Sequence, residues 1–177
     1  TVDPAEGVIR RLTQAQYKNS IRDILGPDIV IAGSFEPDSA ISGLLTVGAS
    51  QTSISSWGVE QYERISYKLT AQVFANESIR NRLVPCASTA TFDEVCAKSF
   101  ISEVGQRLWR RPLSEAEVNA LTEISRNAND VLNQFDASLE FALATLLQSP
   151  NFLFRVELGE PDPNKQTIRR YTNYEMA

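Results

Sequence analysis

The sequence predicts a mainly α-helical, bundle-like domain with a long ordered loop and a short β element near its C-terminus. Three observations support this fold class. Apolar residues recur at helical spacing over most of the chain, capping patterns precede several of these stretches, and the spacing becomes alternating only after residue 150. With 177 residues, of which 42% are hydrophobic, the chain can bury a sizeable core. We therefore expect one folded domain, or two small ones that share an interface.

The first predicted helix lies in the stretch RRLTQAQYKNSIRDILG. Thr13 and Gln16 have the spacing of a capping box, in which each side chain bonds the other residue's backbone N–H at the start of a helix. Gly26 is the type of residue that ends many helices. The apolar residues between these signals fall on one face at helical spacing: Tyr17, Ile21, Ile24 and Leu25.

Residues 26–52 lack helical spacing and contain four glycines and two prolines between short apolar runs. We interpret them as a long ordered loop, which in a compact domain is usually functional or covered by another segment. Glu36 and Asp38 are the best-placed carboxylate pair in this loop. Two carboxylates can perform acid–base or glycosidase chemistry, whereas acidic residues beside proline and serine also form turns, and both interpretations stay open.

Further helices are predicted from capping patterns and apolar spacing. The pairs Thr91/Glu94 and Ser114/Glu117 have capping-box spacing. The segment FDASLEFALATLLQS is apolar on most sides, which is typical of a central helix packed all round. In order, the predicted helices cover residues 56–75, residues 77–84, a stretch that begins after Thr91 and ends near the sequence RRPL, a stretch that begins at Ser114, and FDASLEFALATLLQS up to Pro150.

After Pro150 the spacing of apolar residues changes from helical to alternating. Phe152, Phe154 and Val156 alternate along NFLFRVELG, which predicts a short strand, and TIRRY is its expected partner after the turn EPDPNK. Thr172 and Glu175 repeat the capping-box spacing close to the last residue. Because one helical turn is unstable alone, we expect this end to be held by packing or by a partner chain, or to fray.

The composition argues against several classes of function. With 17 basic and 22 acidic residues the net charge is −5, which disfavours nucleic acids and anionic membranes as partners. No apolar run reaches the roughly 18 residues needed to span a bilayer. The absence of histidine excludes imidazole catalysis and His-ligated zinc or haem within this sequence. We therefore assign no catalytic residue, cofactor-binding residue or metal ligand.

Cys86 and Cys96 are the only cysteines. Their separation does not fit a Cys-x-x-Cys metal or redox motif, and two thiolates alone make a poor zinc site. The spacing favours a disulfide, which implies a periplasmic or extracellular location. The alternative is a buried helical Cys96 with a free loop thiol at Cys86.

A cationic and aromatic cluster marks the end of the helix before Pro112. Its members, Arg107, Trp109, Arg110 and Arg111, are candidate anion-binding residues, because arginine forks and an aromatic platform can hold a carboxylate or sulfate. A structural role fits the same residues, since cations stabilise a helix C-terminus and proline ends the helix.

Three stretches, taken in order, resemble one known family: RRLTQAQYKNSIRDILG, CAKSFISEVGQRLWRRPLSEAEV, and LLQSPNFLFRVELG followed by YTNYEMA. They are similar to the amino-terminal half of a family of secreted bacterial proteins, abundant in planctomycetes and myxobacteria, that are built from tandem domains of unknown function. The resemblance implies a periplasmic or extracellular protein in which the two cysteines pair. It also implies that a further helical domain follows and that c-type cytochrome modules lie elsewhere in the polypeptide.

We divide the chain into residues 1–85, a helical segment with the loop 26–52, and residues 86–177, a helical segment that ends in the β element and the start of a further domain. The first functional hypothesis is a non-catalytic structural or interaction domain of a larger secreted bacterial protein, packed against its C-terminal remainder or a partner chain. One alternative is the N-terminal part of a periplasmic oxidoreductase whose haem c belongs to the parent protein or a partner, since this sequence has no Cys-x-x-Cys-His site. Another is a carbohydrate-binding or carbohydrate-acting module that uses the acidic loop. Whether the protein is an enzyme is left open.

Overall fold

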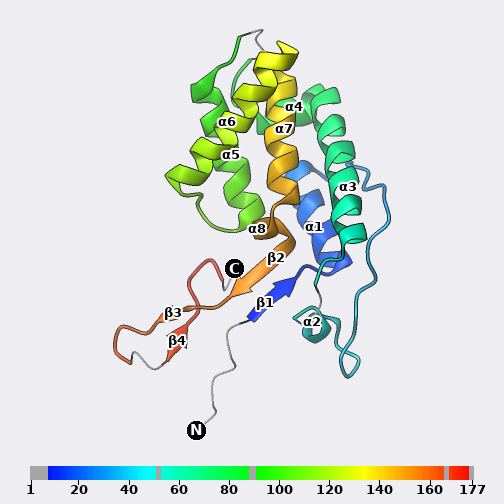
Figure 1. The fold of residues 1–177 in the computed structure, drawn as a ribbon, viewed down its shortest axis with the longest axis vertical. Helices are drawn as coiled ribbons and strands as arrows, with labels where there is room; N and C mark the ends of the chain where they lie inside the picture. The colour runs from blue at the N-terminus through cyan, green and yellow to red at the C-terminus, as the bar shows by residue number, and fades with distance from the viewer. Residues whose placement is uncertain (1–7, 51–52, 88–90, 166–167, 176–177) are drawn as a thin grey trace.

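The computed structural model describes residues 8–50, 53–87, 91–165 and 168–175, and over these residues the chain is mainly α-helical, as predicted (Figure 1). Long helices form the bundle, and a narrow arm of short strands extends from one end of it. No helix in the described part is long and apolar enough to cross a membrane. The helices are α1 (Gln14–Leu25), α2 (Leu45–Gly48), α3 (Ser56–Ala75), α4 (Glu77–Leu83), α5 (Glu94–Trp109), α6 (Glu115–Leu132), α7 (Phe135–Gln148) and α8 (Pro150–Leu153).

Capping side chains set most of the helix starts, and those of α1 and α6 were predicted. The capping box of α1 is confirmed, because Gln16 N donates to Thr13 Oγ1 at 3.3 Å and Thr13 N donates to Gln16 Oε1 at 3.0 Å. The box that begins α6 at Ser114 is also present. Helix α5 begins after Thr91, as predicted, but the predicted Thr91/Glu94 capping box is wrong as its start, since Asp93 caps this helix by accepting the Cys96 N–H at 2.9 Å. A short carboxylate on an extended residue reaches the third N–H of the helix as well as a hydroxyl does.

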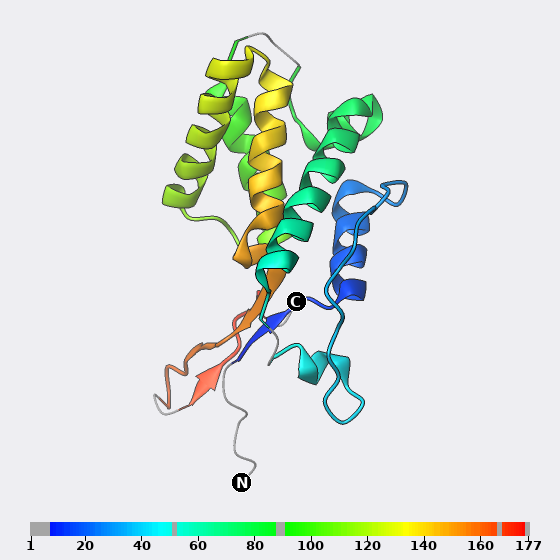
Figure 2. The same ribbon diagram turned by 45° about the vertical axis from the view of Figure 1, so that its right-hand side comes forward.

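Helix α7 is the central element, as its apolar sequence predicted. It packs against α5 and lies between α3 on one side and α6 on the other (Figures 1 and 2). Its side chains Leu139, Leu143 and Leu147 are fully buried. The outward face of α7 is less enclosed than predicted, because the Phe141 side chain is 40% exposed.

Two antiparallel strand pairs correct the predicted β element. Strand β2 (Phe154–Glu157) pairs with β1 (Val8–Arg11) and not with TIRRY. Strand β4 (Arg169–Arg170), within TIRRY, pairs instead with β3 (Glu160–Pro161). Phe152 is helical because Ser149 caps the short helix α8 and Pro150 occupies its first turn. The β1–β2 pair therefore joins the two ends of the chain beside the bundle.

The core is formed by segments from both halves of the chain. Buried side chains of α1 and α3, such as Tyr17 and Leu69, belong to the same hydrophobic cluster as Phe100 of α5 and Phe152 of α8. The predicted boundary after residue 85 falls between α4 and α5. The division into residues 1–85 and 86–177 stays a prediction.

Candidate functional site

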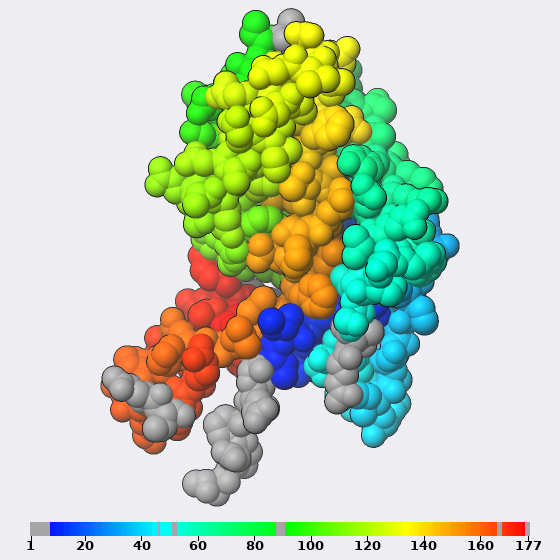
Figure 3. Space-filling view, in the orientation of Figure 1, coloured from blue at the N-terminus to red at the C-terminus, as the bar shows by residue number. Residues whose placement is uncertain are grey.

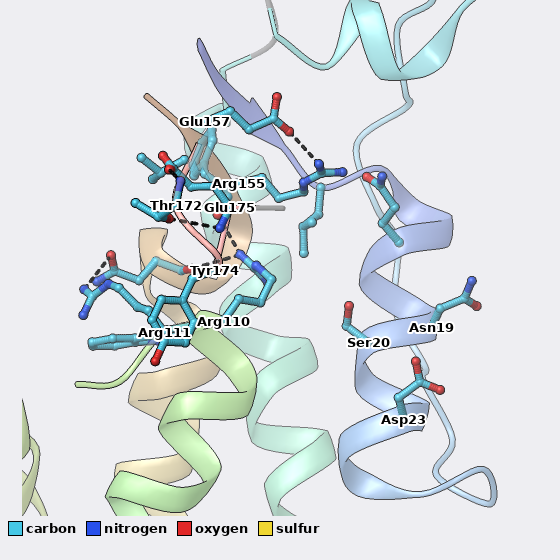
Figure 4. Close-up of a pocket in the computed structure, with 16 residues that line it drawn as sticks. Asn19, Ser20, Asp23, Arg110, Arg111, Arg155, Glu157, Thr172, Tyr174 and Glu175 are labelled. Atoms are coloured by element: carbon cyan, nitrogen blue, oxygen red, sulfur yellow. Dashed lines mark hydrogen bonds and ion pairs between the residues drawn. The ribbon is translucent and has the colours of Figure 1, made fainter. Parts of the chain in front are cut away.

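A cleft of about 740 Å³ lies between α1 and the junction of α5, α8, β2 and the turn at residues 172–175 (Figure 4). One wall comes from α1 and the other from the ends of the remaining elements. The two walls differ in chemistry, since the α1 wall is polar, whereas the opposite wall combines three arginines with aromatic side chains and two glutamates.

The α1 wall consists of Gln16, Asn19, Ser20 and Asp23. Their spacing places them on one face of the helix, while Tyr17, Ile21 and Leu25 on another face are buried in the core. Only the apolar face of α1 was used to predict this helix. The polar face was visible in the same stretch, because residues 16, 19, 20 and 23 also recur at helical spacing.

Arg110 is the central cation of the opposite wall. It follows α5 with a left-handed backbone (φ 56°), which turns its side chain back toward α8. Its Nη2 donates to the carbonyls of Asn151, Phe152 and Phe154 at 3.0, 3.1 and 2.8 Å. Burial lowers the pKa of Arg110, and the nearby charge of Arg155 lowers it further. Arg110 thus binds the carbonyls at the α8–β2 turn, and its charge lies in the wall of the cleft.

Arg111 and Trp109 have structural partners, which were not predicted from the sequence. Arg111 forms a bidentate pair with Glu117, with Nη1–Oε2 at 2.9 Å and Nη2–Oε1 at 2.7 Å. Its guanidinium lies 5.4 Å from the centre of the Trp109 ring. The Trp109 Nε1–H donates to the Leu146 carbonyl at 3.2 Å. Arg107 is exposed on α5 and does not line the cleft.

The Arg111–Glu117 pair predicts an acid-sensitive contribution to stability. The hydrogen bond from Arg111 and those from Ser114 lower the pKa of Glu117 from 4.5 to about 2, against the opposing effect of desolvation. A carboxylate with a lowered folded-state pKa stabilises the protein above the unfolded-state pKa, and this stabilisation is lost as the pH falls toward the folded-state value. The stability advantage of wild type over Glu117→Gln should therefore shrink between pH about 4.5 and pH about 2.

Urea denaturation of both proteins across this pH range measures the effect. Glu115→Gln removes an exposed carboxylate from the same first turn of α6 and is the control. It should leave the pH dependence as in wild type. A constant difference between wild type and Glu117→Gln from pH 7 to pH 2.5 would contradict the assigned pair.

Arg155 and Glu157 bring β2 into the site. Glu157 is buried and pairs with two arginines, with Oε1 2.6 Å from Arg155 Nη2 and Oε2 2.9 Å from Arg10 Nε. The sequence analysis missed both residues of β2. Charges that alternate with apolar residues in a short strand give only a weak signal, and the β1–β2 pairing that places them was not predicted.

The turn at residues 172–175 closes one end of the cleft. The predicted capping box is present, because Thr172 N donates to Glu175 Oε2 at 2.7 Å and Glu175 N donates to Thr172 Oγ1 at 3.2 Å. Glu175 Oε1 also accepts the Gly159 N–H at 2.7 Å. Desolvation raises the pKa of Glu175, but these hydrogen bonds outweigh it and the net shift is downward. Within the described residues this segment is one turn held by the arm, and residues 176–177 lie outside them.

The predicted loop pair Glu36 and Asp38 lies apart from this cleft and is bound by Arg11. Arg11 Nη1 is 2.9 Å from Glu36 Oε2, and Arg11 Nη2 is 3.4 Å from Asp38 Oδ1. Glu36 Oε1 accepts the backbone N–H and hydroxyl of Ser55. A Cβ at Gly58 would lie 2.6 Å from the Glu36 carboxyl carbon, so glycine makes room for this carboxylate. These contacts attach the long loop to β1 and α3.

The disulfide between Cys86 and Cys96 is present, with Cα atoms 6.1 Å apart. It joins the segment after α4 to the first turn of α5. Among the described residues no group of three or more His, Cys, Asp or Glu side chains is arranged to hold a metal ion. Of the positions singled out by the sequence, Arg110 lies in the polar cleft, Glu36 and Asp38 are bound by Arg11, and Cys86 and Cys96 form the disulfide.

Comparisons with known proteins identify two families within the chain. Residues 10–75 match the family model described as "PSD3: Protein of unknown function (DUF1587)". Residues 96–157 match the model described as "PSD5: Protein of unknown function (DUF1595)". The chain is therefore similar to two families of unknown function in tandem, which agrees with the tandem arrangement implied by the resemblance. Searches of curated proteins and of solved structures found no match.

Proposed function

We propose that this chain is a non-catalytic interaction domain of a larger secreted bacterial protein, and that a helix of that protein packs in a groove on α7. The observation that carries the proposal is an apolar groove of about 490 Å³ on the face formed by α3, α7 and α6. Figure 3 shows this face, with α7 exposed between the other two helices.

The groove has the shape and polarity that suit a helix. Small side chains, Ala120 and Ala144, leave space along α6 and α7. Three large apolar side chains also line it with substantial exposure: Tyr67 at 43%, Ile124 at 40% and Phe141 at 40%. The Tyr67 and Phe141 rings contact each other edge to face with centroids 6.3 Å apart. An amphipathic helix buries its apolar face in grooves of this kind, because large side chains on the incoming helix fill the space above small ones.

The charges near the groove favour an amphipathic helix with basic flanks. Glu63 lies one turn before Tyr67 on α3, and Glu140 precedes Phe141 on α7. Lysine or arginine beside the apolar stripe of the occupant would meet these two carboxylates. Glu117 also lines the groove, but its charge is already paired with Arg111.

A periplasmic or extracellular location forms part of the proposal. The Cys86–Cys96 disulfide supports it, because structural disulfides persist in oxidising compartments and are rare in the cytosol. The two families of unknown function found in tandem support a multidomain parent.

Hydroxyl-radical footprinting of the native polypeptide and of the isolated chain tests the proposal. The Tyr67 and Phe141 side chains should be oxidised several-fold more slowly in the native polypeptide, because the docked helix shields them. Tyr171 is the matched control, since it is 46% exposed and does not line the groove.

Intact mass and a Phe141→Glu variant complete the test. A native polypeptide of 19.7 kDa with unchanged footprints would contradict the proposal. In a larger parent, Phe141→Glu should restore fast oxidation of Tyr67. Val131→Glu, at a side chain that is 78% exposed outside the groove, should not. Equal slowing at Tyr67 and Tyr171 would also count against a specific groove.

A further inference from the structure

We propose that the cleft between α1 and β2 binds a small organic anion, whose carboxylate is held by Arg110 and Arg155. This inference is independent of the groove on α7, which lies on α3, α6 and α7. Of the four residues predicted from the sequence as an anion-binding cluster, it retains Arg110, and it adds Arg155 from β2.

Arg110 is the first of the two arginines that would hold the carboxylate. Its hydrogen bonds within the described residues go to four backbone carbonyls, the three at the α8–β2 turn and that of Leu108 at 3.1 Å. In the part of the chain that the structure describes, no carboxylate pairs with it. These bonds use Nη1 and Nη2, which leaves the Nε–H for a ligand. A partly buried guanidinium that is bound only by neutral acceptors gains from an anion, because its charge is otherwise uncompensated.

Arg155 is the second of these arginines. It lines the same cleft, and its positive charge is close enough to disfavour the charged form of Arg110. Its only ion pair within the described residues is with Glu157, which is shared with Arg10. An anion between Arg110 and Arg155 would relieve their repulsion, and a carboxylate can accept hydrogen bonds from both guanidinium groups.

The opposite wall indicates that the ligand is an organic molecule and not a bare ion. A cleft of about 740 Å³ is far larger than a sulfate or phosphate needs, and it falls within the size range of small-molecule pockets. Across from the arginines, Asn19 and Ser20 offer uncharged donors and acceptors (Figure 4). These groups suit hydroxyl or amide groups on the rest of the ligand.

The two glutamates at the arginine end of the cleft are already bound within the protein. Both oxygens of Glu175 accept backbone N–H groups, from Gly159 and Thr172. Both oxygens of Glu157 pair with arginines. Asp23 lies on the α1 wall, opposite Arg110 in Figure 4. The cleft therefore has a cationic end for the carboxylate and a polar end for the remainder of the ligand.

Isothermal titration with citrate at constant ionic strength tests the proposal, with sulfate and phosphate as the inorganic comparison. Citrate should bind saturably with one site per chain and more tightly than either inorganic ion, because it adds a hydroxyl group and an organic body to its carboxylates. Arg155→Gln should weaken citrate binding by about tenfold or more, since a charge-assisted hydrogen bond is lost.

Arg107→Gln is the matched control. It removes the same charge three residues before Arg110, but Arg107 does not line the cleft. Citrate affinity should therefore stay within about twofold after screening by salt. Ser20→Asp should also weaken binding, because it places a negative charge on the facing wall without touching Arg110. Circular dichroism melting of each variant checks that the fold is retained.

Several results would overturn the proposal. If Arg155→Gln and Arg107→Gln weaken citrate binding equally, the binding would reflect general charge attraction and not a specific site. Equal affinity for citrate, sulfate and phosphate would contradict an organic ligand, and an absence of saturable binding would contradict the site itself. Retained citrate binding in folded Arg155→Gln would remove Arg155 from the assignment.

Discussion

Replacing Arg11 by methionine is expected to destabilise the protein by about 3–5 kcal/mol, the range found when one partner of a buried ion pair is removed. The Arg11 side chain is 3% exposed, and those of Glu36 and Asp38 are 13% and 16% exposed. Methionine fills much of the same volume but leaves both carboxylates without their cation in a site that water barely reaches.

Arg11 also connects segments that are distant in the sequence. Its Nη2 donates to the Pro37 carbonyl at 3.1 Å, and its backbone N–H donates to the Ala49 carbonyl at 3.1 Å. Asp38 Oδ2 accepts the Gln14 N–H at 3.0 Å in the first turn of α1. Arg11→Met should therefore release the loop 26–52 as well as lower global stability, and limited proteolysis should cleave this loop first.

Urea denaturation gives the size of the Arg11 effect, and two variants separate its causes. Arg64→Met removes an exposed arginine that pairs with Glu60 within one helix, and such pairs contribute only about 0.3–0.5 kcal/mol. Adding Glu36→Gln and Asp38→Asn to Arg11→Met should recover part of the loss, because neutral amides cost less to bury unpaired. If Arg11→Met lowers the free energy of unfolding by less than about 1 kcal/mol, the assigned role of Arg11 in binding Glu36 and Asp38 would be contradicted.

Local signals explain why the helices were predictable from the sequence. A capping box such as Thr13/Gln16 spans one turn, and the apolar stripe of α1 spans a few turns, so both can be read without knowing the rest of the fold. The error at Thr91 had a local cause too, since Asp93 competes for the same cap and was not considered. The β1–β2 pair joins Val8 to Glu157, and no short stretch of sequence contains that information.

The candidate sites show the same limit. Arg107, Trp109, Arg110 and Arg111 were predicted together because they adjoin in sequence, but their partners lie elsewhere. Arg110 meets carbonyls of α8 and β2, and Arg155 reaches the cleft only because β2 pairs with β1. Glu36 and Asp38 were recognised as a pair, whereas their partner Arg11 lies 25 residues or more away in the chain. Residue type can thus be read from sequence, but pairing across the fold has to be read from the structure.

Removal of the disulfide is expected to have the second large effect on stability. On the chain-entropy model, a closed loop of this length contributes about 2.5–3 kcal/mol, because the bond restricts the unfolded chain. Cys86→Ala combined with Cys96→Ala should therefore lower the melting temperature by roughly 5–12 °C for a chain of this size. Alanine suits both positions, since Cys96 is buried in the first turns of α5 and needs an apolar substitute.

The double variant should lose the stability that the disulfide contributes and little more, because the neighbouring contacts do not depend on the bond. Arg80 donates to the Cys86 carbonyl at 2.6 Å and pairs with Asp136 at 2.8 Å, and neither bond involves the cysteine side chains. Reduction of wild type by a phosphine should reproduce the fall in melting temperature, and the same treatment of the double variant should have no effect. Alkylation and intact mass, measured before and after reduction, count the free thiols. An unchanged melting temperature after verified reduction would contradict the prediction, because it would mean that the loop from Cys86 to Cys96 is already constrained in the unfolded chain or that closing it contributes no stability.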